Sequence, residues 1–539
     1  MSNQERGFAT PARADAKVSA AAPGADAVIV LATFNARYAH TALALRCLQA
    51  NLGSWRGETA IVEFTLEQRP LDALEQVLAL RPRIIGLSVY LWNRSHCQAF
   101  AEALRQVAPG IRLVLGGPEV SFAPPGDDLV QAADYVIVGE GEQAFATLCG
   151  EILAGRAPTP GVVVAPLPQW SALELPYADY TEMDLRQRTV YVEASRGCPF
   201  RCAFCLSADE PRVRRLPPAR LHAALDTLWR RGARAFKFLD RTFNAHLPTA
   251  LAHLHYLHAL GPEVSALHFE IAPHLVSTPL IAALAAFAPG VVQVEAGVQS
   301  LDAEVWQRIG RRGDPARALA GLQRLRQETG VHIHADLIVG LPGEDLAAFG
   351  RGFDALMASG AHEIQVGILK RLWGTPLARQ AEGWSLVFAA APPYEVLQTP
   401  HLTFQEVMHM RRFARFWDLW GNSGHFTQSL ALWWQVVTPF AGFLAFSQWL
   451  HGQGVGGAGV SLQRRFELIF SYLTTCTGLA PPAVAEALLR DYLRAGRDDL
   501  PPFLRPFLPA GRSLAELRDQ LGCPAVRGSK GQARQARHL

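Results

Sequence analysis

The sequence predicts an α/β protein that contains two parallel sheets and a helical C-terminal region. Two observations carry this prediction: short apolar runs alternate with helical stretches in two successive series, and the series are separated by a proline-rich segment. The length of 539 residues also exceeds the ~250–300 residues at which a single hydrophobic core stops growing. More than one domain is therefore expected.

The first series occupies residues 26–160. Five apolar runs (AVIVLATF, TAIVEFTL, RIIGLSVY, IRLVLGG and ADYVIVGE) alternate with four helical stretches. Strict alternation of this kind predicts a Rossmann-like or flavodoxin-like parallel sheet with helices on both faces. Ligands of such sheets bind beyond the carboxyl ends of the strands, where the loops hold residues 35–40, 88–93, 116–119 and 139–142.

The second series occupies residues 189–380 and follows an extended linker expected at 161–188. Its six strands, beginning with TVYVEASRG and ending with EIQVGILKRL, are each followed by a helical or loop segment. This pattern predicts a partial TIM barrel whose functional loops follow the strands. Residues 381–510 are expected to form a Trp-rich helical domain, residues 1–25 a disordered tail, and residues 511–539 a disordered basic tail.

Composition restricts the function classes. The net charge of +3 is small and spread along the chain, so no electrostatic footprint for nucleic acid is evident. The polar, Ala/Pro-rich start is unlike a signal peptide, and a cytoplasmic protein is expected. Residues Phe426 to Leu450 carry no charge and are long enough to span a bilayer, but Pro439 interrupts them, which favours a pair of buried helices.

Three cysteines give the strongest local signal. Cys198, Cys202 and Cys205 have the spacing Cys-x3-Cys-x2-Cys in RGCPFRCAFC, directly after the first strand of the second series. Three thiolates on one loop suit three corners of a four-iron four-sulfur cluster and leave one iron open to an exogenous ligand. The alternative is an accidental or zinc-binding group of cysteines. The other five cysteines lie in apolar helical patterns and are expected to be small buried residues.

On these residues the chain resembles the radical S-adenosylmethionine (SAM) superfamily over residues 189–377. The resemblance implies that SAM binds the open iron through its amino and carboxylate groups and is cleaved to a 5′-deoxyadenosyl radical. It places Phe204 against the adenine and Glu295, in VEAGVQS, at the ribose. In DLIVGLPGE it places the backbone of Gly340, Leu341 and Pro342 near the adenine.

One element departs from that family. Most members have a Gly-Gly-Glu segment after the second barrel strand that receives the SAM amino group, whereas this chain has FLDRTFN. Asp240 or Asn244 is a candidate for that contact, and the alternative is a turn stabilised by Asx hydrogen bonds. Glu270, too, either contacts SAM or has a structural role at the end of its strand. Lys370 and Arg371 either face a substrate or are solvated.

The first series resembles the cobalamin-binding domains found upstream of some radical SAM cores. The matching fragments are SVY, LVLGGPE and VGEGE. The resemblance places Ser88 near the nucleotide tail of cobalamin, and it implies that Gly116 and Gly117 admit that tail closely. It also assigns Gly139, Glu140 and Gly141 to the cofactor site.

The loop that usually supplies the lower cobalt ligand departs from the family pattern. The Asp-x-His-x-x-Gly sequence is missing, and the loop has the sequence FNARYAH. His40 is a candidate lower ligand, with a local hydrogen-bonding role as the alternative. Tyr90 and Trp92 either cover the lower corrin face or pack as ordinary aromatic residues.

Together the resemblances imply a cobalamin-dependent radical SAM enzyme that methylates an unactivated carbon of a small-molecule or natural-product substrate. Its reductant would be a flavodoxin or ferredoxin. The alternatives are a cobalamin-assisted oxidation, cyclisation or rearrangement, and a non-catalytic cobalamin or iron–sulfur sensor. A methylthiotransferase is disfavoured because Cys47, Cys97 and Cys149 are dispersed on helices. The C-terminal region resembles an uncharacterised extension and is expected to cap the barrel mouth.

Overall fold

The computed structural model describes residues 18–19, 27–456, 459–495, 501–508 and 516. The chain divides into two compact units, each described by itself: Met1–Val190 with Arg230–Gly232, and Tyr191–Trp229 with Ala233–Leu539. Nearly all of the predicted tails, 1–25 and 511–539, lie outside the described residues.

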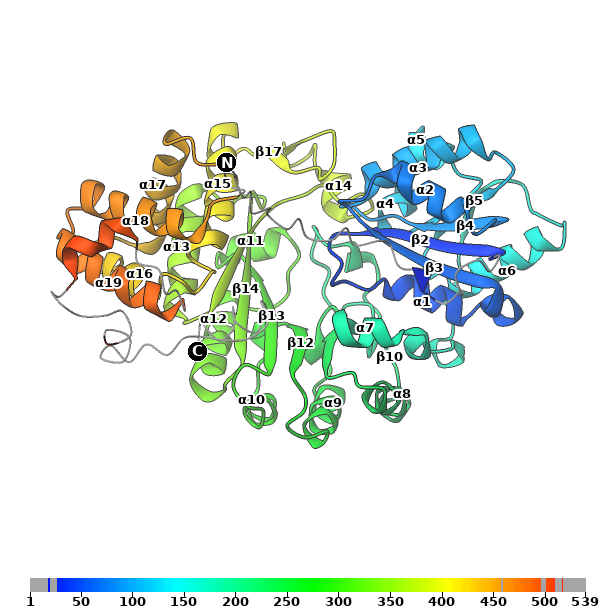
Figure 1. Ribbon diagram of the computed structural model, residues 1–539, viewed down its shortest axis with the longest axis horizontal. Coiled ribbons are helices and arrows are strands. Elements are labelled where there is room, and N and C mark those ends of the chain that lie inside the picture. Colours follow the sequence, from blue (N-terminus) through cyan, green and yellow to red (C-terminus); the bar gives the residue numbers. More distant parts are fainter. Residues whose placement is uncertain (1–17, 20–26, 457–458, 496–500, 509–515, 517–539) are drawn as a thin grey trace, which may run out of the picture. The chain divides into compact units, whose positions relative to one another are not determined.

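The first unit contains a seven-stranded sheet in the order β1-β3-β2-β4-β5-β6-β7 (Figure 1). Strands β2 to β7 pair in parallel, and β1 pairs with β3 antiparallel. The five predicted strands are confirmed. The bounds are β1 (Val18–Ser19), β2 (Ile29–Asn35), β3 (Thr59–Thr65), β4 (Ile84–Ser88), β5 (Arg112–Gly116), β6 (Tyr135–Val138) and β7 (Gly161–Val164).

Two edge strands were not predicted. Strand β7 occupies the segment expected to be an extended linker, and β1 lies in the expected N-terminal tail. The rest of the linker segment contains short helical turns, so it is a structured part of the first unit: η2 (Trp170–Ala172), η3 (Pro176–Asp179) and α7 (Glu182–Gln187).

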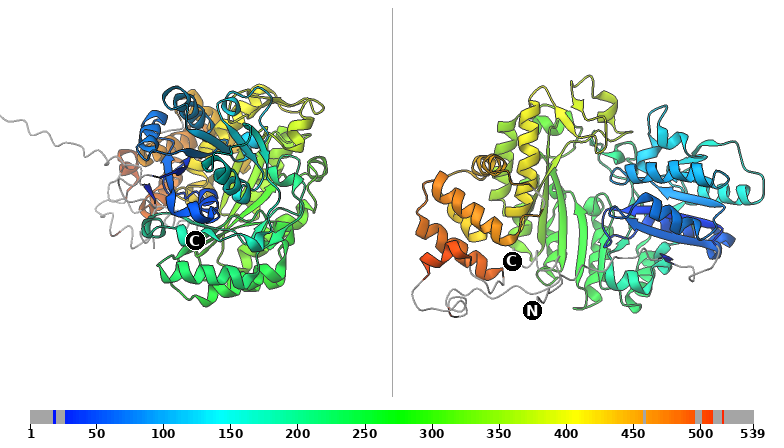
Figure 2. Two further views of the ribbon diagram at one scale, coloured as in Figure 1. Left: turned by 90° about the vertical axis from the view of Figure 1, so that its right-hand side faces the viewer. Right: turned by 45° about the horizontal axis from the view of Figure 1, so that its top comes forward.

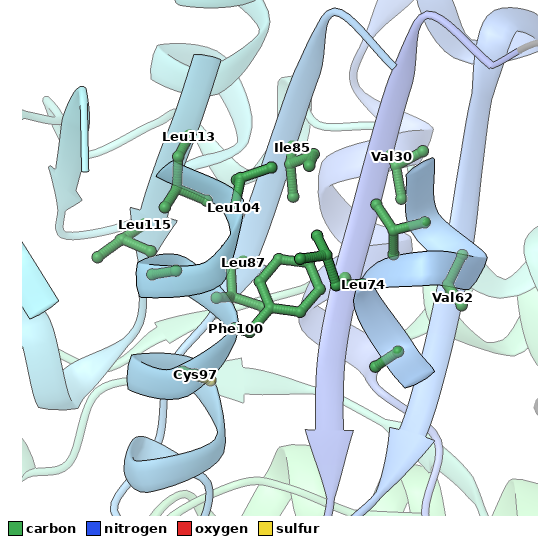
Figure 3. Close-up of a cluster of buried hydrophobic side chains, with 14 of the residues drawn as sticks. Val30, Val62, Leu74, Ile85, Leu87, Cys97, Phe100, Leu104, Leu113 and Leu115 are labelled. Atoms are coloured by element: carbon green, nitrogen blue, oxygen red, sulfur yellow. The ribbon is translucent and has the colours of Figure 1, made fainter. Parts of the chain in front are cut away.

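Helices cover both faces of this sheet. Strands β2, β3 and β4 are buried at nearly every position and are mostly apolar, because both faces of the sheet are covered. On one face, strand residues pack with α2 and α3: Figure 3 shows Phe100 and Leu104 among Ile85 and Leu87. Burying each such side chain stabilises the fold by ~1.5–3 kcal/mol. The helices of the unit are α1 (Leu43–Ala50), η1 (Gly53–Glu58), α2 (Pro70–Leu78), α3 (Arg94–Val107), α4 (Pro118–Ser121), α5 (Asp128–Gln131) and α6 (Glu142–Leu153).

The second unit contains the predicted six-stranded sheet, in the order β15-β14-β13-β12-β11-β8. Strands β11 to β15 pair in parallel. The bounds are β8 (Val190–Val192), β11 (Ala235–Phe238), β12 (Ala266–Ile271), β13 (Val292–Gln299), β14 (His332–Val339) and β15 (Glu363–Ile368). The partial barrel is thus confirmed.

Helices follow the barrel strands. They are η5 (Phe243–Ala245) with α9 (Leu247–Ala259) after β11, η6 (Pro273–Leu275) with α10 (Thr278–Ala285) after β12, α11 (Ala303–Arg308) with α12 (Pro315–Glu328) after β13, α13 (Leu346–Ala358) after β14, and α14 (Pro376–Gln380) after β15. Helix α8 (Pro218–Arg230) precedes β11. In β12 and β13 every second residue is buried and apolar, while the residues between are mostly polar and half-buried. One face of the sheet is therefore available for polar chemistry.

The C-terminal region is helical, as predicted, and its helices pack on the barrel. They belong to the same compact unit, and Phe353 of α13 contacts the rings of Phe413 and Trp417, with centroids 5.2 and 4.9 Å apart. Figure 2 shows α15 beside the edge of the barrel sheet. The elements are a hairpin of β16 (Val387–Phe388) and β17 (Val396–Gln398), then α15 (Phe404–Trp420), α16 (Thr427–Trp433), α17 (Pro439–Gly452), α18 (Leu462–Cys476), α19 (Pro481–Arg494) and η7 (Pro502–Phe507).

The uncharged stretch from Phe426 to Leu450 forms α16 and most of α17, with Pro439 in the first turn of α17. The predicted pair of helices is confirmed. Across the described parts of the chain, no helix combines the length and apolar character required for a membrane span.

Of the four described cysteines outside the three-cysteine loop, three are buried as predicted. Cys47, Cys97 and Cys149 are buried on helices, whereas Cys476 at the end of α18 is exposed, so its predicted burial was wrong. Burial raises the pKa of Cys149 to about 12. Cys523 lies outside the described residues.

Candidate active site

The three-cysteine loop follows β8 and is enclosed by a short hairpin of β9 (Ser195–Arg196) and β10 (Arg214–Arg215). Gly197 starts the loop with φ of +89°, and a Cβ atom there would lie 2.5 Å from the carbonyl oxygen of Arg212. Only glycine permits this approach of two backbone segments. Cys198 and Cys202 are buried, and Cys205 is half-buried.

Backbone hydrogen bonds fix the loop to the rest of the barrel. The amide of Ala203 donates to the carbonyl of Ile309 over 2.7 Å, and the amide of Leu377 donates to the carbonyl of Ala203 over 2.8 Å. The cysteine loop is therefore held by two segments, one after α11 and one at the start of α14. Neither contact was predictable from the cysteine spacing.

Arg311 is a member of this site that the sequence analysis missed. Its Nη1 atom lies 3.6 Å from the Sγ atom of Cys202, its Nη2 atom donates to the carbonyl of Gly297, and its guanidinium lies 4.8 Å from the ring centre of Trp306. Burial raises the pKa of the Cys202 thiol, and the charge of Arg311 opposes that shift. A fixed cation beside this sulfur favours the thiolate that an iron–sulfur cluster needs.

Within the described residues, no group of three or more His, Cys, Asp or Glu side chains is arranged to hold a metal ion. The three cysteine ligands of a cubane cluster bind three different iron atoms, so this result concerns sites for a single ion.

Three carboxyl groups lie on the polar face of the barrel sheet. Glu270 of β12 is the register partner of Glu295 of β13, and Asp336 of β14 is paired with Gly297, two residues further along β13. Glu295 accepts a hydrogen bond from Nε2 of His268 over 3.0 Å and lies 3.8 Å from Nζ of Lys237. The sheet thus gathers two of the predicted cofactor residues, Glu270 and Glu295, on one surface.

The three groups differ in their protonation. The hydrogen bond from His268, aided by the charge of Lys237, lowers the pKa of Glu295 to about 2. Burial and the charge of Glu295 raise the pKa of Glu270 to about 7. Burial also raises the pKa of Asp336 well above its usual range, and Glu295 adds to the effect. The face therefore presents one fixed carboxylate and two carboxyl groups that a bound cation would ionise.

Asp240 and Asn244 hold the chain in place. Asp240 is buried and accepts hydrogen bonds from the amide of Ala194 over 3.0 Å and from the hydroxyl of Ser195. Asn244 is buried and bonds both the amide and the carbonyl of Ala272, over 2.9 and 3.0 Å. These contacts favour the structural alternative for both residues, because their side chains are engaged by backbone groups and, for Asp240, also by the Ser195 hydroxyl.

The GLPG turn follows β14. Gly340 has φ of +92°, and a Cβ atom there would lie 2.7 Å from Cγ1 of Val396 in β17. Leu341 and Pro342 are buried. The hairpin of the C-terminal region therefore lies against the carboxyl end of a barrel strand, while Phe204 is half-buried in the cysteine loop.

The two basic residues after β15 make local contacts. The backbone of Lys370 forms an isolated antiparallel β-bridge with that of Glu395, and the Arg371 guanidinium lies 4.4 Å from the ring centre of Trp373 and 5.9 Å from that of Phe388. Arg371 is thus packed by aromatic rings from the barrel and from the hairpin.

In the first unit, the sheet order places β2 between β3 and β4, so the strand order reverses at the neighbouring strands β2 and β4. Ligands of open parallel sheets bind at this switch point, beyond the carboxyl ends of the strands. Ser88 ends β4, and its carbonyl accepts from Thr33 and Asn93 over 3.1 Å each. Asn93 is fully buried and also bonds the carbonyl of Phe34. This side chain joins the ends of β2 and β4 and was not singled out from the sequence.

The predicted glycines of this unit differ in their roles. Gly117 has φ of +109°, and a Cβ atom there would lie 2.3 Å from the carbonyl oxygen of Val89, so the fold itself requires glycine. A Cβ atom on Gly116 would meet nothing within 4 Å. Gly139 has φ of +97°, Glu140 is half-buried, and Gly141 precedes α6. Gly116 thus leaves open space at the carboxyl edge, which fits a closely approaching ligand.

Aromatic residues lie in the same loops. The rings of Tyr90 and Trp92 stack with centroids 4.5 Å apart and an interplanar angle of 4°, and Trp92 is 51% exposed. His40 lies in the loop after β2, and its carbonyl accepts from Asn35 over 3.0 Å and from Arg188. A stacked pair of a half-buried and an exposed aromatic ring at the switch point suits a large planar cofactor.

Comparison with known protein families agrees with these features. A B12-binding domain matches residues 29–149, the radical SAM superfamily matches residues 192–353, and a family of unknown function (DUF4080) matches residues 382–509. The family matches thus assign the barrel to the radical SAM superfamily and the first sheet to the B12-binding domains. The chain is a radical SAM protein with an N-terminal B12-binding domain and a C-terminal DUF4080 region, and its cofactors are a [4Fe–4S] cluster, SAM and cobalamin.

Two curated proteins with sequence similarity to this chain are named methyltransferases. The cobalamin-dependent radical SAM methyltransferase TokK of Streptomyces tokunonensis is 26% identical over 65% of this chain and 56% of its own length. The 2-(S-pantetheinyl)-carbapenam-3-carboxylate methyltransferase of Streptantibioticus cattleyicolor is 27% identical over 54% of this chain and 48% of its own length. The chain thus spans about half the length of these curated relatives.

Solved structures share the fold. The cobalamin-dependent SAM radical enzyme OxsB with aqua-cobalamin bound superposes with a TM-score of 0.60 and 13% identity, over 92% of this chain and 84% of its own. The radical SAM methyltransferase TsrM of Kitasatospora setae, with tryptophan substrate and a SAM analogue bound, gives a TM-score of 0.55 and 19% identity over 69% and 80%.

Proposed function

We propose that this chain is a cobalamin-dependent radical SAM methyltransferase that methylates an unactivated carbon of a small-molecule or natural-product substrate. The three-cysteine loop carries the proposal, because it is fixed at the carboxyl end of a barrel strand in a chain that also has a B12-binding domain. The names of the relatives, both methyltransferases, support the methyl-transfer part.

When bound, the cluster and SAM supply the radical that removes a hydrogen atom, and cobalamin supplies the methyl group. The chain holds these groups. Cys198, Cys202 and Cys205 would ligate the cluster, and the charge of Arg311 would favour the thiolate of Cys202 against the burial that raises its pKa. Phe204 and the backbone of residues 340–342 would enclose the adenine.

The polar face of the barrel sheet receives the charged part of SAM in this proposal. Glu295 is held ionised by His268 and Lys237, so it accepts hydrogen bonds from ribose hydroxyls without first losing a proton. Glu270 titrates near neutral pH, and a neighbouring ammonium or sulfonium charge would lower its pKa and ionise it. In the first unit, Ser88 and Gly116 border the expected path of the nucleotide tail. We further propose that the enzyme works in the cytoplasm with a flavodoxin- or ferredoxin-type reductant.

The proposal is tested by counting the SAM products. A radical methylase consumes one SAM for hydrogen abstraction and another for remethylating cobalamin. Reconstituted enzyme, incubated anaerobically with candidate metabolites, should form 5′-deoxyadenosine and S-adenosylhomocysteine in about equal amounts. Formation of 5′-deoxyadenosine with no matching S-adenosylhomocysteine would instead support oxidation, cyclisation or rearrangement.

A further inference from the structure

Four charged side chains form a buried network in the first unit, and we call it the loop clamp: Arg46 of α1, Glu63 of β3, Asp184 of α7 and Arg188. Their side chains are 0, 4, 4 and 8% exposed. Arg46 contacts Glu63 and Asp184 over 2.9 Å each, and Arg188 contacts the same two residues over 2.7 and 3.0 Å. The two positive and two negative charges balance one another.

Such a network is a weak source of stability. Removing charges from water costs several kcal/mol per ion, and apolar residues of similar volume often stabilise a fold as well or better. Burial would raise the pKa of Glu63, but Arg46 and Arg188 outweigh it and lower the pKa to about 2, so the network stays ionised at neutral pH. A role in fixing one backbone conformation accounts better for these four charges than a role in stability alone.

The backbone that the loop clamp holds is the loop of residues 36–41, between β2 and α1. Arg188 donates from Nε to the carbonyl of Tyr38 over 2.9 Å and from Nη2 to the carbonyl of His40. The next residue, Thr189, donates its amide to the carbonyl of Ala39 over 2.8 Å and accepts from the hydroxyl of Thr41 over 2.8 Å. Four consecutive loop residues are thus bound to two residues that lie about 150 positions later.

Glu63 ties both ends of the same loop. Its Oε1 atom accepts from Nδ2 of Asn35, the last residue of β2, over 3.1 Å, and from the amide of Ala42, just before α1. Residues 36–39 are nevertheless exposed on their other side. The loop is therefore held from one side and presented to solvent on the other.

The loop that the loop clamp holds lies where a ligand of this sheet is expected to bind. It follows β2 at the switch point of the sheet, where ligands of this architecture bind, and it lies within the B12-binding match. Asp184 and Arg188 lie beyond residue 149, where that match ends. A cofactor loop of the B12-binding domain is thus shaped by the segment that leads into the barrel.

We infer that Arg188 is a positioning residue for cobalamin: through the loop clamp it holds residues 36–41 in the conformation that receives the cofactor. A loop ordered before binding spares the cofactor the cost of ordering it, and affinity falls by the fraction of molecules in which the loop is out of place. The inference rests on cobalamin binding by this unit and is independent of methyl transfer.

The test uses full-length protein with hydroxocobalamin and the variants Arg188→Lys and Arg188→Ala. Lysine keeps the charge but lacks the planar fork that reaches Glu63 and two loop carbonyls at once. Arg186→Lys is the matched control, because Arg186 lies two residues earlier in α7, is exposed, and donates a hydrogen bond to the carbonyl of Glu182 in its own helix. We expect the dissociation constant of cobalamin to rise about tenfold or more in both Arg188 variants and to stay unchanged in the control.

Two further readouts separate positioning from general stability. In Arg188→Lys, amide hydrogen exchange should speed up in peptides covering 36–42 and stay unchanged in the core strands β4 and β5. The electron paramagnetic resonance spectrum of bound cob(II)alamin should change, while iron content stays at about four per chain.

Several outcomes would overturn the inference. Wild-type affinity and cobalt spectrum in both Arg188 variants would do so, as would faster exchange throughout the first unit, which would make Arg188 a general stabiliser. Absence of cobalamin binding by the wild type would overturn it together with the cofactor assignment. If cobalamin binds as expected and no methyl group is transferred, only the proposed reaction fails.

Discussion

Replacement of the two neighbouring glycines at the end of β5 should affect different properties. We expect substitution of Gly117 to lower folding stability and substitution of Gly116 to weaken cobalamin binding. Gly117 has φ of +109° and ψ of 165°, a region of backbone space that essentially only glycine occupies. An added Cβ atom would lie 2.3 Å from the carbonyl oxygen of Val89, which must then move. Gly116, by contrast, has open space around the position of a Cβ atom.

The expected loss of folding stability differs between the two substitutions. The backbone conformation alone costs ~1–3 kcal/mol for a residue other than glycine, and the contact with Val89 adds to it, so Gly117→Ala should lose about 3 kcal/mol or more. For a unit of this size that corresponds to a fall in melting temperature of roughly 6–12 °C. Gly116→Leu should change stability by about 0.5 kcal/mol at most, yet place a side chain where the nucleotide tail of cobalamin is expected.

Circular dichroism melting of the cofactor-free proteins and equilibrium binding of hydroxocobalamin measure the two effects. We expect a lower melting temperature for Gly117→Ala, and a wild-type melting temperature with greatly weakened cobalamin binding for Gly116→Leu. An unchanged melting temperature for Gly117→Ala would refute the argument from backbone geometry. If Gly116→Leu binds cobalamin with wild-type affinity, the cofactor does not bind at this edge of the sheet.

Three other substitutions test separate parts of the molecule. Changing Cys198, Cys202 and Cys205 together to Ala should abolish the brown absorption and all SAM cleavage, and a retained cluster would show that the ligand loop is misassigned. His40→Ala should alter the absorption spectrum of bound cobalamin only if His40 ligates cobalt, so an unaltered spectrum assigns it a local role. Burial raises the pKa of Glu344 from 4.5 to about 8. Folding stability should therefore fall as pH rises from about 4.5 through 8, and melting temperatures of Glu344→Gln should lack this fall; an identical pH dependence in both proteins would contradict the assignment.

The sequence was sufficient for the elements with strong periodic patterns. All eleven predicted strands exist, because long apolar runs and alternating stretches are governed by local sequence. Strand β7 was missed because its four residues are flanked by prolines and its valines are exposed, Val162 by 62% and Val164 by 74%. At a sheet edge, tertiary pairing decides the structure, and a short segment carries little signal of it.

In the candidate site, too, features set by local sequence were predictable and contacts between distant residues were not. The cysteine loop was predictable from spacing, since its ligands lie within eight residues. Arg311 and Arg188 were not, because their partners lie 109 and 125 residues away, and a lone arginine carries no local sign of such contacts. Asp240 and Asn244 were singled out from the sequence, yet their hydrogen bonds to the backbone are visible only in the fold.

The decisive step of the proposed reaction is the transfer of a methyl group from SAM to a carbon of the substrate. Its most direct test is anaerobic incubation of reconstituted enzyme and reductant with candidate metabolites and with SAM labelled in its methyl group, followed by mass spectrometry. We expect a product that carries the label on carbon, formed by the wild type and absent from the triple cysteine variant. An unlabelled product that depends on the three cysteines would contradict methyl transfer and leave the radical SAM assignment in place.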